Sequence, residues 1–199
     1  MFKKLVIASN NAGKLREIGQ LLAPLNIEVI AQSALSISEA EEPHCTFIEN
    51  ALAKARHASL HSGLPALADD SGICLEALNG APGVQSAYFA GMPKDDANNN
   101  AHMLKVLKQH SNRFAYYYCC AVLVRRHNDP QPLIAEGIWQ GAILKKPRGE
   151  NGFGYDPLFM DSKTGKTGAE LPAEIKNKIS HRGQAMRKML QLIENLPCD

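Results

Sequence analysis

The first part of the chain alternates a short apolar run with a stretch of helical periodicity. Residues 5–8 are apolar throughout, which is typical of a buried strand. Leu15, Ile18 and Leu22 then recur at helical spacing, and Pro24 marks the end of that helix. The pattern therefore predicts a strand, a small polar loop and a helix in direct succession.

The rest of the chain carries both kinds of signal. Thr46 followed by Glu49 is a capping box, which predicts the start of an alanine-rich helix. Two runs of strand-forming residues separated by turn residues predict a long hairpin late in the chain. The expected strands lie over residues 27–31, 66–69, 73–78, 113–124 and 133–144, and further helices over residues 95–109 and 182–196. This order predicts an α/β fold with a mixed sheet and flanking helices.

Two adjacent acids, Asp69 and Asp70, come directly after an apolar run and are followed by Ser71 and Gly72. We expect a strand to end at these acids and the chain to turn at Gly72. Negative charge gathered at the rim of a sheet is costly unless a cation compensates it, which favours Mg²⁺ as the cation. The alternative is an ordinary Asp-rich turn without a ligand.

The loop over residues 9–14 has the composition of an anion-binding site. Two asparagines, a glycine and Lys14 precede the first helix, where backbone N–H groups and a lysine can meet a phosphate. A P-loop is excluded, because Ala8 and Leu15 stand where that motif requires Gly and Ser or Thr. The alternative is a helix N-cap with no ligand.

Two clusters near the C-terminus suggest contacts with a nucleotide. Residues 152–157 combine glycines, which allow close approach of the backbone, with Phe153 and Tyr155, which can stack on a planar base. Lys176, His181 and Arg182 can donate hydrogen bonds to phosphate or carbonyl oxygens. For the aromatic residues the alternative is a turn with core aromatics. For Arg182 it is a surface ion pair with an acid such as Glu194 or Asp156.

Composition excludes several classes of protein. A net charge of +2 over 199 residues is too small to indicate a nucleic-acid partner. No apolar run approaches the roughly 20 residues of a membrane span, and no signal-peptide core is present, so we expect a cytoplasmic protein. The cysteines show neither Cys-x-x-Cys nor zinc spacing, so we expect reduced thiols, with Cys119 and Cys120 as packing residues. The cysteines are Cys45, Cys74, Cys119, Cys120 and Cys198.

Taken together, these motifs resemble those of the inosine triphosphate pyrophosphatases, and the resemblance covers almost the whole chain. The segments that carry it lie, in order, over residues 9–14, 46–55, 68–72, 80–83, 153–157 and 180–183. Pro172 and Ile175 depart from the family pattern, which more often has a Thr and a Glu before the lysine. We expect this departure to alter the start of a helix slightly and to leave the chemistry intact.

The resemblance implies a fold, a reaction and partners. The fold would be one domain over residues 1–199, elongated, with a strongly twisted mixed sheet and a central cleft between two lobes. The reaction would be Mg²⁺-dependent hydrolysis of ITP, dITP and XTP to the nucleoside monophosphate and pyrophosphate. The protein would be a homodimer with a purine nucleoside triphosphate substrate.

The resemblance also assigns roles to residues. Asp70 would be the general base and a Mg²⁺ ligand, Asp69 would support the water shell of the metal, and Glu41 would be the matching ligand, with Glu42 beside it left open. Ser9, Asn11, Lys14, Lys54 and Ser71 would hold the triphosphate, and residues 153–156, His181 and Arg182 the base. The full set of expected substrate contacts is Ser9, Asn10, Asn11, Ala12, Gly13, Lys14, Lys54, Ser71, Phe153, Gly154, Tyr155, Asp156, Lys176, His181 and Arg182.

Two other interpretations remain open at this point. A nucleotide-binding regulator without turnover would need the phosphate loop and the base pocket, but it would not need Asp69, Asp70 and Glu41. A pyrophosphatase of the septum-inhibitor type, acting on modified pyrimidine nucleotides, would resemble the N-terminal loop. It would lack the motif over residues 180–183.

Overall fold

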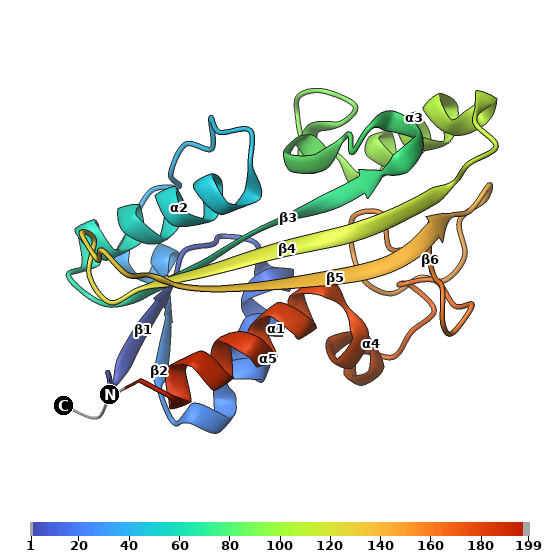
Figure 1. Ribbon diagram of the computed structural model, residues 1–199. Coiled ribbons are helices and arrows are strands. Elements are labelled where there is room, and N and C mark those ends of the chain that lie inside the picture. The colour runs from blue at the N-terminus through green and yellow to red at the C-terminus, as the bar shows by residue number, and fades with distance from the viewer. Residues whose placement is uncertain (1, 197–199) are drawn as a thin grey trace. The chain divides into compact units, whose positions relative to one another are not determined.

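The computed structural model describes residues 2–196 and contains a six-stranded sheet with the order β2-β1-β3-β4-β5-β6 (Figure 1). Strand β1 pairs in parallel with β2 and β3, whereas β5 pairs antiparallel with β6. The sheet is therefore mixed, as the sequence predicts. Its strands are β1 Lys4–Ile7, β2 Glu28–Ala31, β3 Ala66–Leu75, β4 Phe114–Val124, β5 Leu133–Ile143 and β6 Phe159–Asp161.

Local signals fix the starts of three helices. The side chains of Asn11, Thr46 and Asp95 each accept a hydrogen bond from a backbone N–H in the first turn of the helix that follows. The α-helices are α1 Ala12–Leu22, α2 Phe47–Ser62, α3 Asp96–Val106, α4 Ala173–Ile179 and α5 His181–Glu194. Short 3-10 turns span Ala23–Leu25, Gln32–Leu35, Glu76–Leu78, Gly83–Tyr88 and Leu107–Gln109.

The chain divides into two compact units. Unit 1 contains the described residues up to Asp70, then Cys119–Gly137, then the described residues from Arg182 onward. Unit 2 contains Ser71–Tyr118 and Ile138–His181. Strands β3, β4 and β5 each contribute residues to both units.

Each unit has its own hydrophobic core. In unit 1, Ile18 and Leu22 of α1 and Met186 and Met189 of α5 belong to one buried cluster. Figure 1 shows these two helices on one face of the sheet and α2 on the other. The core of unit 2 is richer in aromatic residues, among them Tyr117, Trp139, Tyr155 and Phe159.

The course of β3 corrects one prediction. The sequence predicts two short strands flanking an acidic turn, but β3 runs without interruption from Ala66 to Leu75, through both acids and Gly72. Gly72 is required by packing instead of by a turn, because a Cβ at this position would collide with the carbonyl oxygen of Gly83 and the hydroxyl of Ser86. The last residues of the second expected strand form the 3-10 turn Glu76–Leu78.

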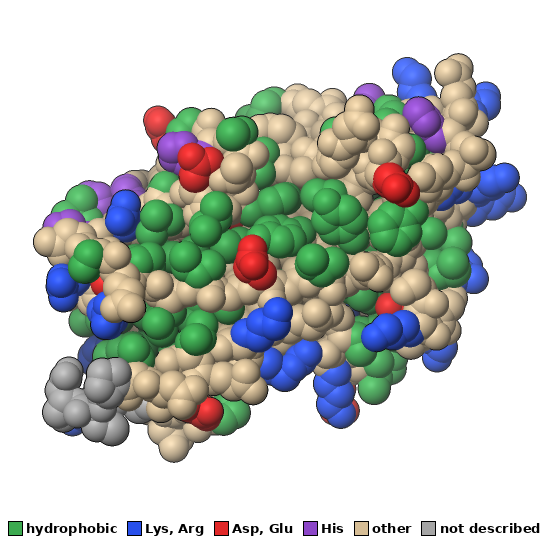
Figure 2. Space-filling model, in the orientation of Figure 1, with side chains coloured by type: hydrophobic (Ala, Val, Ile, Leu, Met, Phe, Trp, Pro, Cys, Tyr) green, Lys and Arg blue, Asp and Glu red, His purple; other side chains and the backbone are tan. Residues whose placement is uncertain are grey.

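The long hairpin is confirmed as neighbouring strands β4 and β5. On β5, Ala135 and Trp139 are buried, whereas Ile134 and Ile138 are about half exposed. Figure 2 shows hydrophobic side chains gathered over this part of the sheet. The short strand β6 was not predicted, because three residues are too few to give a periodic pattern, and α4 was expected only through the family resemblance around Pro172 and Ile175.

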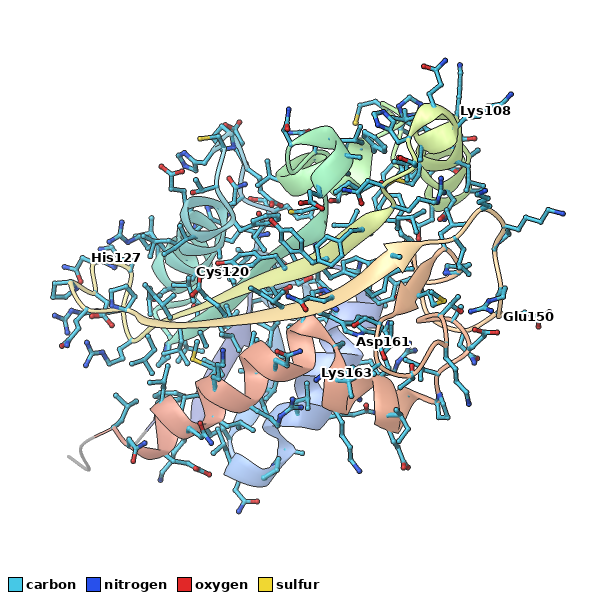
Figure 3. All side chains as sticks on the ribbon, turned by 45° about the vertical axis from the view of Figure 1, so that its right-hand side comes forward. Lys108, Cys120, His127, Glu150, Asp161 and Lys163 are labelled. Carbon is cyan, nitrogen blue, oxygen red and sulfur yellow. The ribbon has the colours of Figure 1, made fainter. Side chains whose placement is uncertain are left out.

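Cys119 and Cys120 lie buried on β4, as expected of packing residues, and Cys120 is labelled in Figure 3. Burial raises the pKa of the Cys120 thiol to about 12, and it also raises that of Cys119. Cys45 and Cys74 are free thiols as well, and Cys198 lies outside the described residues. Within residues 2–196, no helix has the length and apolar character that crossing a bilayer requires.

Candidate active site

The two acids of β3, Asp69 and Asp70, are buried, and they contact different neighbouring side chains. Asp69 is 2% exposed and Asp70 is 6% exposed. Successive side chains of a strand point to opposite faces of the sheet, so the two carboxylates face different helices. This arrangement replaces the predicted pair of acids at a sheet rim.

Asp69 is neutralised by two cations in unit 1. Its Oδ2 atom lies 3.1 Å from the Lys14 ammonium and accepts a hydrogen bond of 3.3 Å from Nε of Arg182. The Cys119 thiol is 3.8 Å from the same oxygen. Burial raises the pKa of the Asp69 carboxyl, but Lys14 and Arg182 outweigh burial and hold the pKa well below its usual range. Asp69 is therefore a permanently ionised anchor for these two cations.

Asp70 is bound by α2. Its Oδ1 atom is 3.5 Å from the Lys54 ammonium, and its Oδ2 atom accepts a hydrogen bond of 3.2 Å from the Asn50 amide. Burial raises the pKa of the Asp70 carboxyl, and Lys54 and Lys14 offset only part of that rise. The pKa values of the two neighbouring acids are thus moved in opposite directions, which is the pattern of a carboxylate suited to proton transfer beside one that stays ionised.

Asn50 was missed as a site residue. It is 1% exposed and lies four residues before Lys54 on α2, so both side chains reach Asp70 from one helix face. Its amide also exchanges two hydrogen bonds with the backbone of His44, which fixes the loop before the helix. The signal in the sequence is a polar pair at i and i+4 on a helix face that is otherwise alanine. We call the six residues Lys14, Asn50, Lys54, Asp69, Asp70 and Arg182 the carboxylate cluster.

The loop before α1 is an N-cap as well as a candidate phosphate site. The Asn11 side chain accepts hydrogen bonds from the N–H groups of Gly13 and Lys14, at 2.9 and 3.1 Å. The Ser9 hydroxyl accepts from the N–H of Asn11, and Asn10 accepts from Gln32. Since these loop N–H groups already have partners, the Lys14 ammonium is the group best placed to meet an added anion.

The acidic loop contributes Glu42 rather than Glu41 to this network. The Glu42 carboxylate lies 2.9 Å from the Lys54 ammonium, which also contacts Asp70. Glu41 is exposed, and among residues 2–196 it forms no ion pair with a lysine or an arginine. Two carboxylates from different segments therefore converge on one cation, which shows that this place accommodates positive charge.

The carboxylates of Asp70 and of residues 41–42 are compatible with Mg²⁺ if water and substrate phosphate complete the coordination shell. Within residues 2–196, no group of three or more His, Cys, Asp or Glu side chains could hold a metal by itself. Mg²⁺ commonly takes only one or two protein carboxylates and completes its shell with water and substrate phosphate. Asp70 and an acid of residues 41–42 meet that lower requirement.

The expected base-binding loop lies in unit 2, and we call residues 153–156 the aromatic loop. Asp156 is buried, and its Oδ2 atom accepts hydrogen bonds from the Phe153 N–H at 2.9 Å and from the Lys176 ammonium at 2.7 Å. The Lys176 ammonium also lies 4.8 Å from the centre of the Phe153 ring. Asp156 and Lys176 thus fix the shape of the loop.

The two aromatics of this loop differ in their surroundings. Tyr155 is 4% exposed and donates a 2.7 Å hydrogen bond from its hydroxyl to the Ser86 carbonyl. It therefore belongs to the core, as the alternative interpretation of this motif proposed. Phe153 is half-buried and remains the better candidate for stacking on a base.

His181 belongs to an aromatic stack. Its ring lies 4.6 Å from the ring of Tyr117, at an angle of 6°, and 6.3 Å from that of Trp139. Trp139 is fixed in turn by a 2.7 Å hydrogen bond from its indole N–H to Asp161 of β6, which Figure 3 labels. The orientation of the imidazole is therefore determined by core packing in unit 2.

Arg182 follows His181 in sequence but joins the carboxylate cluster. It is 3% exposed and contacts Asp69, so Arg182 is a buried side chain and not the surface residue that the alternative interpretation assumed. Ser71, the next residue after Asp70, is half-buried in β3. Pro172 provides no side-chain cap for α4.

Comparisons with known proteins agree with this fold. A family model described as the Ham1 family matches residues 5–192. The dITP/XTP pyrophosphatase of Nitrosomonas europaea is 60% identical over 190 residues, which cover 96% of this chain and 94% of that protein. The dITP/XTP pyrophosphatase of Aromatoleum aromaticum is 59% identical over 197 residues, covering 99% and 100%.

A solved structure confirms the fold class. A HAM1 protein from Coxiella burnetii superposes with a TM-score of 0.92 at 45% identity, covering 98% of this chain and 100% of that one. The chain belongs to the Ham1 family. The family resemblance predicted from the motifs is thereby confirmed, whereas the single domain with a central cleft stays a prediction.

Proposed function

We propose that this protein hydrolyses non-standard purine nucleoside triphosphates, namely ITP, dITP and XTP, to the monophosphate and pyrophosphate. The observation that carries the proposal is the buried Asp70, held by Asn50 and Lys54 beside a second cation site at Lys14. The names of the relatives, dITP/XTP pyrophosphatases, support the same reaction.

Asp70 is the proposed general base. Hydrolysis of a triphosphate needs an aligned water and stabilised charge on the phosphates more than covalent help from the protein. A carboxylate with a raised pKa is a better proton acceptor than one held fully ionised by cations, which distinguishes Asp70 from Asp69. The Asn50 amide and the Lys54 ammonium orient the Asp70 carboxylate toward that water.

Lys14 and Lys54 are the proposed phosphate ligands. In the free protein their charges are balanced by Asp69, Asp70 and Glu42. A triphosphate would compete with these carboxylates for the two ammonium groups. Ser9, Asn11 and Ser71 would add hydroxyl and amide donors around the same anion.

Mg²⁺ is the proposed cofactor, held by Asp70 and by Glu41 or Glu42. When bound, Mg²⁺ would neutralise the phosphates and lower the pKa of a coordinated water. Because Lys54 already pairs with Glu42, Glu41 is the acid of this pair that we expect to bind the metal together with Asp70.

We propose that selectivity for the purine base depends on hydrogen-bond donors of the protein. Hypoxanthine and xanthine present oxo groups and no amino group, whereas adenine presents an amino group at C6 and guanine presents one at C2. Arg182 and His181 can donate to an oxo oxygen but would face an amino group as one donor faces another. Such a site discriminates strongly against the wrong base, because binding that base leaves buried hydrogen-bond donors of the protein without an acceptor.

The decisive measurement is the identity of the products. We expect XTP, dITP and ITP to give one pyrophosphate each in the presence of Mg²⁺, with GTP and ATP much slower. Anion-exchange chromatography of the reaction separates pyrophosphate from orthophosphate. A diphosphate nucleotide with orthophosphate, or binding without turnover, would contradict the proposal.

The oligomeric state and the compartment complete the proposal. We propose a homodimer that works in the cytoplasm, where its nucleotide substrates are made. Light scattering coupled to size-exclusion chromatography measures the mass directly. A mass of about one chain at assay concentration would contradict the dimer.

A further inference from the structure

Helix α3 holds the aromatic loop by both polar groups of one backbone residue. The Asp96 carboxylate accepts a 2.7 Å hydrogen bond from the N–H of Gly154, and the Asn100 amide donates a 2.8 Å hydrogen bond to its carbonyl oxygen. Asp96 and Asn100 are four residues apart and so lie on one face of the helix. All three residues belong to unit 2.

The sequence of α3 has low helix propensity, and its asparagine side chains make tertiary hydrogen bonds instead. Residues 98–100 are three consecutive asparagines, and asparagine is a weak helix former. Asn99 is buried and links α3 to the backbone of Ala87 and Ala90 through two hydrogen bonds. Asn100 makes the corresponding link to Gly154.

The Asn100 amide has a fixed orientation. Its NH₂ group donates to two carbonyl oxygens, those of Gly154 and of Asp96 one turn earlier. Its own Oδ1 atom is buried and, within residues 2–196, accepts no hydrogen bond. A buried acceptor without a hydrogen bond lowers stability. The orientation that lets Asn100 donate to the Gly154 carbonyl is therefore kept although it leaves Oδ1 of Asn100 unsatisfied.

The opposite side of Gly154 is open. Its φ of +63° favours glycine, and a Cβ built there would meet nothing within 4 Å. The single N–H of Gly154 already donates to Asp96, so it cannot donate to a ligand unless that bond to α3 breaks, whereas the carbonyl oxygen keeps a second lone pair. Gly154 was expected to contact substrate, and these bonds exclude its N–H as a donor to substrate while α3 holds it.

We propose that Asp96 and Asn100 are positioning residues that set base selectivity by fixing the aromatic loop through Gly154. This inference rests on the proposed function, because it takes residues 153–156 as the part of the protein that faces the base. Phe153 is fixed in two ways: its own N–H donates to Asp156, which Lys176 holds, and the next residue, Gly154, is held by α3. Loss of either bond from α3 would let Phe153 move while the carboxylate cluster stays intact.

The test uses four variants of the full chain. Asn100→Ala removes the donor to the Gly154 carbonyl, and Asp96→Ala removes the acceptor for its N–H. Asp96→Asn keeps an oxygen acceptor and should restore the wild-type behaviour. Asn98→Ala is the matched control, because Asn98 is an exposed neighbour on the same helix.

The readout is binding by calorimetry, which does not depend on turnover. We expect the unmodified protein to bind XMP more tightly than GMP. In Asn100→Ala and Asp96→Ala the ratio of the XMP affinity to the GMP affinity should fall on the order of tenfold. This is the effect expected when one hydrogen bond that positions the loop is lost. Affinity for inorganic pyrophosphate should be unchanged, and Asp96→Asn and Asn98→Ala should match the unmodified protein.

Several results would overturn this inference. An unchanged ratio in both alanine variants would show that α3 does not set selectivity. An equal loss of XMP, GMP and pyrophosphate binding, with a lower Tm, would show only a damaged fold. A protein that binds XMP selectively yet releases no pyrophosphate from XTP would contradict the proposed function, and the affinity ratios would still decide the role of α3.

Discussion

The carboxylate cluster and the aromatic loop are held in place by different kinds of interaction. In the cluster, buried acids and cations neutralise each other, as Asp69 does with Lys14 and Arg182. In the loop, neutral backbone groups are bound by side chains, as Gly154 is bound by Asp96 and Asn100. Removing a charge leaves its partner buried and unpaired, whereas removing one bond from a loop shifts its position.

This difference separates two kinds of effect. Changes in the cluster should alter the rate for every substrate, because all nucleoside triphosphates carry the same phosphates. Changes around the loop and its neighbours should alter the choice of base at similar stability. The following variants test that division, from the largest expected effect to the smallest.

Asp70→Asn should have the largest effect. The amide keeps the shape of the side chain but cannot accept a proton, and loss of a general base costs about 10²–10⁴-fold in rate. We expect kcat for pyrophosphate release to fall by that factor for XTP and dITP alike, with an unchanged circular dichroism spectrum. A rate within a few-fold of the unmodified protein would remove Asp70 from the mechanism.

Arg182→Ala tests whether a residue of the carboxylate cluster also contributes to base selectivity. If Arg182 donates to the base, kcat/KM for XTP should fall about 10–150-fold more than that for GTP, the value of a charge-assisted contact. Arg182 also pairs with Asp69, so the variant should lose some stability as well. Equal losses for XTP and GTP would limit Arg182 to neutralising Asp69.

Two neighbouring glutamates allow a matched test of the metal site. We expect Glu41→Gln to raise the Mg²⁺ concentration for half-maximal activity by about 10–100-fold. Glu42→Gln should change it little, because the Glu42 carboxylate is paired with Lys54. The reverse order in a Mg²⁺ titration would make Glu42 the ligand.

Tyr117→Leu should have the smallest effect on activity, a change in selectivity, together with some loss of stability because Tyr117 belongs to the core of unit 2. The Tyr117 ring stacks on His181, and an aromatic pair is worth about 0.5–1.5 kcal/mol, which corresponds to about 2- to 10-fold. Tyr117→Phe should preserve the XTP-to-GTP ratio of kcat/KM. Phe159→Leu is the control, because Phe159 packs on Tyr117 and Trp139 in the same core. If Phe159→Leu lowered the ratio as much as Tyr117→Leu, the effect would come from the core in general.

Features that depend on neighbours in the chain followed from the sequence. The caps at Asn11 and Thr46 were readable because a cap joins a side chain to a backbone group only two or three residues away. The hairpin of β4 and β5 and the mixed character of the sheet followed from alternation and turn residues. The motifs also named most of the polar residues that form the carboxylate cluster.

Tertiary structure decided the features that join distant segments. The passage of β3 through Asp69, Asp70 and Gly72 depends on the close approach of Gly83 and Ser86, which no local pattern encodes. The same holds for Asn50, whose partner Asp70 is 20 residues away, and for Asn100, whose partner Gly154 is 54 residues away. A sequence determines by itself what short-range hydrogen bonds and periodicity can fix. Which buried polar group meets which is settled only when packing brings their strands and helices together.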